Sequence, residues 1–325
     1  MQTVSDTIGH LRLGEATTFE GLSVFPLFGE HVREKDYLTL DEALERNLAR
    51  VVEVSEQGDV PNLLFENLGD RKVLLVDGDE LVGAKQNRII NLTILVPAHT
   101  KIEIPVSCVE AGRWSYRGRE FKSAERAMFS RGRARKAEQV TVCMRSSGDR
   151  YSDQSEVWND VASCSESFGV DSPTGSMSDI YESNEQRLGK YREAFKAQEG
   201  QIGALFAING KAQGLELFDS SETFGHYLER LVSSYALDSR IEKGNGEEAD
   251  LTEVERFIKG VKNASTEPFA ALGEGEDLRL SGELLAGGAL VAEERVVHLA
   301  AFNLDPENKV TRRRPGRWFS DGEEV

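Results

Sequence analysis

Two short blocks of the sequence combine charged, amide and aromatic side chains in a way that suits the binding of a small anion. The first is Lys85-Gln86-Asn87-Arg88, and the second is SCVEAGRW at 107–114. Arginine binds carboxylate or phosphate through two parallel hydrogen bonds, and a tryptophan ring can stack on a flat base. The expected ligand-binding residues are therefore Lys85, Gln86, Asn87, Arg88, Arg113 and Trp114.

Acidic and thiol side chains near these blocks could act on a bound ligand. Glu80 and Glu110 could transfer protons or bind a metal. Cys108 could be a nucleophile, for which His99 is the nearest base in the sequence. The segment DGDE at 77–80 could hold a divalent cation or could be an ordinary polar turn. The expected catalytic residues are Glu80, Glu110 and Cys108, the metal candidates are Asp77 and Asp79, and a divalent metal is the one cofactor considered.

The cationic block interrupts a segment that otherwise has the composition of a buried strand. If the block is itself a strand, Lys85 and Asn87 point to one face while Gln86 and Arg88 point to the other. A buried cation needs an anionic partner. The block therefore either faces a polar cavity or begins a solvent-exposed strand whose charges pair with nearby acids.

The elements expected around these blocks are short strands. Residues 1–118 contain short runs rich in β-branched residues, separated by Gly, Asp, Asn and Pro, which is typical of a sandwich or open barrel. Antiparallel strands over 85–96 and 101–110 would bring the two polar blocks together. Residues 119–200 predict helices, including a basic helical stretch interrupted at Gly132.

The region 201–304 carries clear local signals. Apolar runs flank Asn209-Gly210, a pair favoured in type I′ hairpins because both residues need positive φ. Two amphipathic helices follow. Asp219 is expected to cap the first helix, and a Thr252–Glu255 capping box is expected to begin the second.

The predicted fold is therefore α+β, with four regions. Residues 1–118 form a sandwich or barrel-like sheet that carries the site, and 119–200 form a helical module. Residues 201–304 form a hairpin–helix–helix–hairpin unit packed on the first region, with its last hairpin turning at 293–294. Residues 305–325 are expected to be a flexible tail.

Composition excludes several classes of protein. The net charge of −17 argues against a nucleic-acid binder, which needs a dense basic surface. No apolar run approaches the roughly 18 residues that span a bilayer. Three cysteines without a C-x-x-C pair argue against a disulfide framework or zinc ribbon. The first twenty residues do not have the pattern of a secretory signal, so a cytoplasmic location is expected.

Both blocks also carry a family resemblance. G-A-K-Q-N-R at 83–88, SCVEAGRW and the later GALFAINGKAQGLELF resemble the ARPP domain family, over about residues 13–302. The family is named for its association with ADP-ribosylglycohydrolases and rhodanese-phosphatase proteins. The resemblance implies a link to NAD-derived or ADP-ribose metabolism and implies that both blocks belong to one site. It implies no catalytic residues.

Two functions follow as expectations. The first is a protein that binds an anionic small molecule, such as one derived from ADP-ribose or NAD, and could hydrolyse or transfer it. In this hypothesis Lys85, Arg88 and Arg113 hold the anion. The alternative is a non-catalytic sensor or accessory protein, whose basic segment 126–136 would dock an acidic partner protein.

Overall fold

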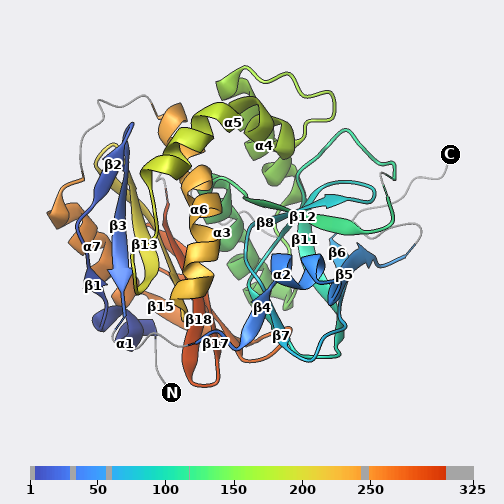
Figure 1. The fold of residues 1–325 in the computed structure, drawn as a ribbon, viewed down its shortest axis with the longest axis horizontal. Helices are drawn as coiled ribbons and strands as arrows, with labels where there is room; N and C mark the ends of the chain where they lie inside the picture. The colour runs from blue at the N-terminus through green and yellow to red at the C-terminus, as the bar shows by residue number, and fades with distance from the viewer. Residues whose placement is uncertain (1–3, 30–33, 56–60, 117, 243–248, 305–325) are drawn as a thin grey trace.

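The computed structural model describes residues 4–29, 34–55, 61–116, 118–242 and 249–304. Its helices and antiparallel sheets confirm the predicted α+β class (Figure 1). The division into four regions stays a prediction, and the expected tail at 305–325 lies outside the described residues.

One large antiparallel sheet joins the beginning of the chain to its last third. Strand β3 (Leu22–Phe28) pairs with β13 (Gln201–Ile208), so that Pro26 lies opposite Ala204. The sheet order is β1-β3-β13-β14-β18-β17-β16-β15, with β2 also paired to β3. The other strands are β1 (Arg12–Leu13), β2 (Thr17–Phe19), β14 (Lys211–Phe218), β15 (Ser265–Ala270), β16 (Glu276–Ser281), β17 (Leu285–Ala292) and β18 (Arg295–Asn303).

A second sheet of six strands curls into what we call the half-barrel. Its order is β12-β8-β9-β11-β6-β5, and a bridge between Val52 and Glu120 brings its two edges together. Its inner face carries a buried apolar cluster that includes Val51, Phe65 and Leu81. The strands are β5 (Ala49–Glu53), β6 (Asn62–Asn67), β8 (Asp79–Gly83), β9 (Arg88–Ile90), β11 (Lys101–Cys108) and β12 (Phe121–Ala127). A small sheet of β4 (Tyr37–Thr39), β7 (Lys72–Leu75) and β10 (Ile94–Val96) lies beside it.

The helices cover both faces of the large sheet. Helices α3 and α6 lie between that sheet and the half-barrel, and α4 and α5 lie at the top of the view (Figure 1). All four helices share one core with both sheets. Helices α1 and α7 cover the opposite face. The bounds are α1 (Val4–Gly9), α2 (Leu40–Glu45), α3 (Ser130–Ser147), α4 (Gln154–Phe168), α5 (Met177–Ala194), α6 (Ser221–Ile241) and α7 (Leu251–Lys262).

Local turn signals were reliable predictors, whereas helix starts were less so. Positive φ at Asn209-Gly210 and at residues 293–294 confirms both predicted hairpin turns. Ser220 caps α6 in place of Asp219, because the Asp219 carboxylate instead accepts hydrogen bonds from Tyr37 and Arg295. The start predicted for α7 is also wrong, since Asp250 is its cap.

The basic stretch after residue 119 also differs from the prediction. Residues 121–127 form strand β12 rather than helix, because pairing with β8 outweighs their helical preference. Helix α3 then runs through Gly132 without interruption.

Candidate functional site

The cationic block is a turn, so the interpretation of it as a strand is wrong. Residues 84–87 connect β8 to β9, and only Arg88 belongs to a strand. The chain bends at Gly83, whose φ is +140° and where an added Cβ would lie 2.6 Å from the Glu120 carbonyl oxygen. All four side chains of the block are buried. The alternative of a solvent-exposed strand start is therefore also wrong.

Strand pairing places the end of the block inside the half-barrel. Arg88 lies opposite Cys108, and Ile90 lies opposite Val106. Ile90 and Val106 belong to the interior apolar cluster. Because side chains alternate along a strand, Arg88 and Cys108 occupy the same interior face one step further along.

Glu53 reaches this end of the interior from a distant strand. It follows Val51 of the interior cluster by two residues on β5, and it is 9% exposed. Its Oε1 accepts the Lys85 backbone N–H at 3.3 Å, whereas its Oε2 has no hydrogen-bond donor among the described residues. Sequence reasoning missed Glu53, because nothing local marks a glutamate at the end of an amphipathic strand.

The Arg88 guanidinium is fully buried and only partly satisfied. Its Nη1 donates to Gln86 Oε1 at 3.2 Å, but Nε and Nη2 have no acceptor in the described part of the chain. No carboxylate of the described residues forms an ion pair with it. Nε–H and Nη2–H form one edge of the guanidinium, the edge that holds a carboxylate or phosphate with two parallel hydrogen bonds.

Two half-exposed aromatic rings lie beside these cations. The Trp114 ring centroid is 5.7 Å from Arg88 Cζ and 5.1 Å from Lys85 Nζ. The Tyr116 ring centroid is 5.2 Å from Lys85 Nζ. Trp114 and Tyr116 are 49% and 51% exposed, so the buried cations lie directly behind rings that reach solvent. We call this group the arginine site: Glu53, Lys85, Gln86, Arg88, Cys108, Trp114 and Tyr116.

Cys108 is held as a neutral thiol. Burial raises its pKa to about 11, although the positive charge of Arg88 acts in the opposite direction. The Gln154 side chain fixes its backbone through hydrogen bonds of 2.7 and 2.8 Å. His99, the expected base, is exposed and bonds to Asp70 instead. His99 therefore does not serve as its base, and burial leaves little thiolate at neutral pH.

Arg113 anchors the turn through its two terminal nitrogens, while its Nε has no acceptor among the described residues. It forms an ion pair with Glu110 at 2.7 Å and donates to the carbonyl oxygens of Gly83 and Ala84 and to Asn87 Oδ1. Burial acts to raise the pKa of Glu110, but hydrogen bonds from Arg113, Thr174 and the Asn87 backbone hold it below its usual value. Arg113 and Glu110 thus hold the backbone that positions Arg88.

Glu80 lies on the other face of the sheet from Arg88. Glu80 pairs with Ile89, while Leu81 pairs with Arg88. Its Oε1 accepts from Ser178 Oγ at 2.8 Å, and burial raises its pKa to about 7. The predicted residues therefore fall into two groups on either side of β8 and β9. The outer group is Glu80, Asn87, Glu110 and Arg113, joined through hydrogen bonds with Ser178 and Thr174.

The two metal candidates point to different cations of the chain. The Asp77 carboxylate binds Lys136 and Arg133, whereas Asp79 binds Arg230 at 2.9 Å and Tyr227 at 3.1 Å. Within the described ranges no three His, Cys, Asp or Glu side chains form a group that could hold a metal ion.

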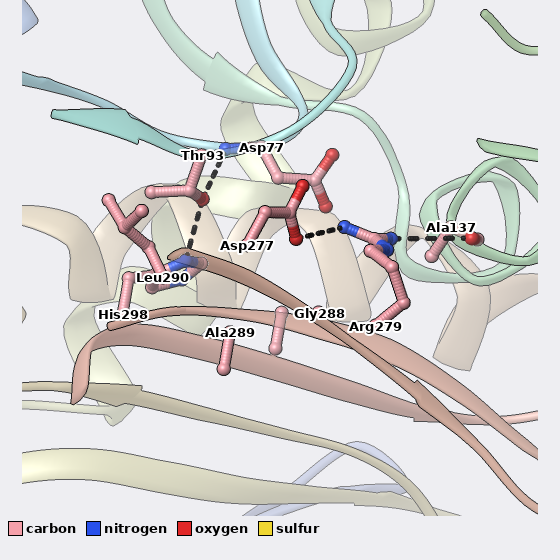
Figure 2. Close-up of a pocket in the computed structure, with 10 residues that line it drawn as sticks. Asp77, Thr93, Ala137, Asp277, Arg279, Gly288, Ala289, Leu290 and His298 are labelled. Atoms are coloured by element: carbon pink, nitrogen blue, oxygen red, sulfur yellow. Dashed lines mark hydrogen bonds and ion pairs between the residues drawn. The ribbon is translucent and has the colours of Figure 1, made fainter. Parts of the chain in front are cut away.

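Asp77 also lines a small cavity between the sheets. Thr93 Oγ1 accepts the Asp77 backbone N–H and bonds to His298 Nδ1, and Asp277 binds Arg279 across the same space (Figure 2). The cavity holds about 10 Å³, which is room for about one water molecule.

The basic segment 126–136 is neutralised within the chain. Arg133 and Lys136 are buried and bind Glu216 and Asp77. The remaining arginines of the segment also have acidic partners: Arg126 with Glu182, Arg131 with Asp238, and Arg135 with Asp160.

Fold and site together define an α+β protein whose half-barrel ends in a buried arginine edge that has no acceptor among the described residues. A family model described as ARG and Rhodanese-Phosphatase-superfamily-associated Protein domain matches residues 10–302. The chain belongs to this family, which confirms the resemblance seen in the sequence. No curated protein and no solved structure matches it. None of the helices in the described ranges is long and apolar enough to cross a membrane.

Proposed function

We propose that this chain is a cytoplasmic protein that binds a small anionic molecule derived from NAD or ADP-ribose, with Arg88 as the principal contact. The observation that supports the proposal is the Nε–Nη2 edge of Arg88, which is buried and has no acceptor among the described residues. Each unsatisfied buried donor costs about 1–3 kcal/mol, and the cost is greater for a charged group. An oxyanion bound to this edge would remove that cost.

The surroundings of Arg88 favour a ligand that also has a flat ring. Trp114 and Tyr116 reach solvent beside Lys85 and can stack on a base. The ends of barrels are common ligand sites, because the closed sheet holds side chains rigidly around a small interior. The family description, which refers to ARG and the rhodanese-phosphatase superfamily, supports the choice of a nucleotide-like anion.

Binding, rather than catalysis, is the function that the geometry supports best. Cys108 is a neutral thiol that the expected base His99 does not contact, and Glu80 faces helix α5 on the far side of the sheet from Arg88. Protein docking through segment 126–136 is less favoured, because its cations already pair with acids of the same chain.

Calorimetric titration of the full chain with ADP-ribose, NAD and AMP tests the proposal. We expect at least one of these to bind, and Arg88→Met to weaken that binding by about 100-fold or more, as expected when a charged two-point contact is lost. The matched control is Arg50→Met on β5, where the arginine is exposed and pairs with Glu66. That variant should bind like the wild type.

Chemical denaturation of the same variants separates a binding role from a structural one. Arg88→Met should unfold at the same or higher denaturant concentration than the wild type, because it replaces an unpaired buried cation with an apolar side chain. Arg113→Met should lose roughly 3–5 kcal/mol, because it leaves Glu110 buried without its cation. The proposal is wrong if Arg88→Met binds every ligand as the wild type does, or if it unfolds as readily as Arg113→Met.

A further inference from the structure

A second unsatisfied group at the arginine site narrows the kind of anion that fits. Glu53 Oε2 is buried and has no donor among the described residues, just as Arg88 Nε and Nη2 have no acceptor. Both side chains lie on the inner face at the same end of the half-barrel. Both also act electrostatically on the Cys108 thiol, with opposite signs, so the thiol lies near each of them.

The Arg88 edge and Glu53 Oε2 each require a different hydrogen-bonding group on the ligand. The Arg88 edge requires oxygen atoms that accept hydrogen bonds. An ionised carboxylate can only accept, so Glu53 Oε2 requires a hydrogen-bond donor. An anion that has only bare oxygen atoms satisfies Arg88 but leaves Glu53 facing another acceptor, which is unfavourable when both are buried.

We propose, on the basis of the proposed function, that the arginine site recognises a phosphoryl group that keeps a proton on one of its oxygens. Such a group accepts two hydrogen bonds from Arg88 and donates one to Glu53. Hydrogen phosphate and the singly charged form of a phosphomonoester have this proton. Sulfate and the internal pyrophosphate of a dinucleotide do not. Glu53 is thus a specificity-determining residue that selects a terminal phosphate over a bridging one.

Phosphate and sulfate provide a matched pair of probes, because they have the same shape and differ in the proton. We would titrate the full chain with inorganic phosphate and with sulfate by calorimetry at fixed pH and ionic strength. The wild type should bind phosphate about tenfold or more tightly than sulfate, since the wrong anion leaves a buried acceptor unpaired. Glu53→Gln should bring the two affinities close together, because a glutamine amide can donate to sulfate while its oxygen still accepts the Lys85 N–H.

Glu103→Gln is the control, because Glu103 is an exposed carboxylate on β11 of the same half-barrel. It should keep the wild-type preference for phosphate. If the wild type binds both anions equally, or if Glu53→Gln keeps the preference, the selection by Glu53 is refuted while anion binding at Arg88 stands. If neither anion binds the wild type, and Arg88→Met binds ADP-ribose, NAD and AMP as the wild type does, both this inference and the proposed function are overturned.

Discussion

Arg88 and Arg113 both lie at the turn between β8 and β9, but their guanidinium groups have different roles. Arg113 forms an ion pair with Glu110 and donates hydrogen bonds to backbone carbonyl oxygens, so it fixes the path of the chain. Arg88 donates one side-chain hydrogen bond, from Nη1 to Gln86, and its two-point edge has no acceptor among the described residues. Residue type alone cannot distinguish them. The two arginines differ in role because each guanidinium has a different position relative to the bend at Gly83, and so has different acceptors within reach.

Glu80 gives the protein a measurable dependence of stability on pH. Burial raises its pKa in the folded protein from 4.5 to about 7. Between these values the folded protein keeps a proton on Glu80 that the unfolded chain has lost, so the contribution of Glu80 to stability is greatest below pH 4.5 and falls as the pH rises to about 7. The loss is on the order of 3 kcal/mol.

The variant Glu80→Gln isolates this effect, because glutamine keeps the hydrogen bond to Ser178 and cannot ionise. The free energy of unfolding of the wild type minus that of Glu80→Gln should fall across pH 4.5–7 and be flat above it. Urea titrations at a series of pH values measure this difference, and other ionisable groups cancel in it. Glu182→Gln, at an exposed position, should show no such slope. A flat difference for Glu80→Gln would mean that Glu80 is ionised in the folded protein.

At the scale of elements, the predictable features are those fixed by neighbours in the sequence. The two hairpins followed from their turn residues, and the antiparallel pairing of β9 with β11 was also predicted. The predicted strand over 85–96 is wrong in its extent, because residues 94–96 form β10 and pair with β7 of another sheet. The half-barrel end could not be predicted as a whole. Glu53 comes from β5, a strand far from β12 in the sequence that a bridge from Val52 to Glu120 brings to the start of β12. Strand β12 itself has a helical composition that its pairing overrides.

The start of α7 shows how close a local signal can be and still mislead. Asp250 and Thr252 are both residues that favour a cap, but only the Asp250 side chain accepts a backbone N–H, at 3.0 Å from Thr252. Asp250→Ala should destabilise the protein by about 1 kcal/mol, because α7 buries Val254, Phe257 and Val261 and must stay helical to do so. Thr252→Ala should cost less than about 0.5 kcal/mol. Guanidinium denaturation compares the two, and an equal loss would restore the predicted capping box.

At the scale of the whole molecule, buried ions connect the sheets. Arg133 and Lys136 of α3 bind Asp77, which follows β7, and Arg133 also binds Glu216 of the large sheet. If the half-barrel and the large sheet separated, Arg133 would lose at least one of its two carboxylate partners, Asp77 or Glu216. Breaking a buried pair costs roughly 3–5 kcal/mol. The shared apolar core adds to this cost, because it includes side chains from both sheets and from α3 to α6.

We therefore expect the chain to unfold in one cooperative transition. Far-ultraviolet circular dichroism reports all elements, and tryptophan fluorescence includes the signals of Trp114 in the arginine site and Trp158 in α4. The two should give the same midpoint in urea. Two separated midpoints would contradict this expectation.

The pairing of β3 with β13 also affects how the protein is made. Pro26 and Ala204 are partners, so one edge of an early apolar strand waits for about 180 further residues to be synthesised. At roughly 5–20 residues per second, this takes about 10–35 s on the ribosome. During that time β3 presents an open, aggregation-prone edge. All strands of the large sheet can pair only after translation is nearly complete. Chaperones that shield nascent chains would therefore raise the yield of folded protein.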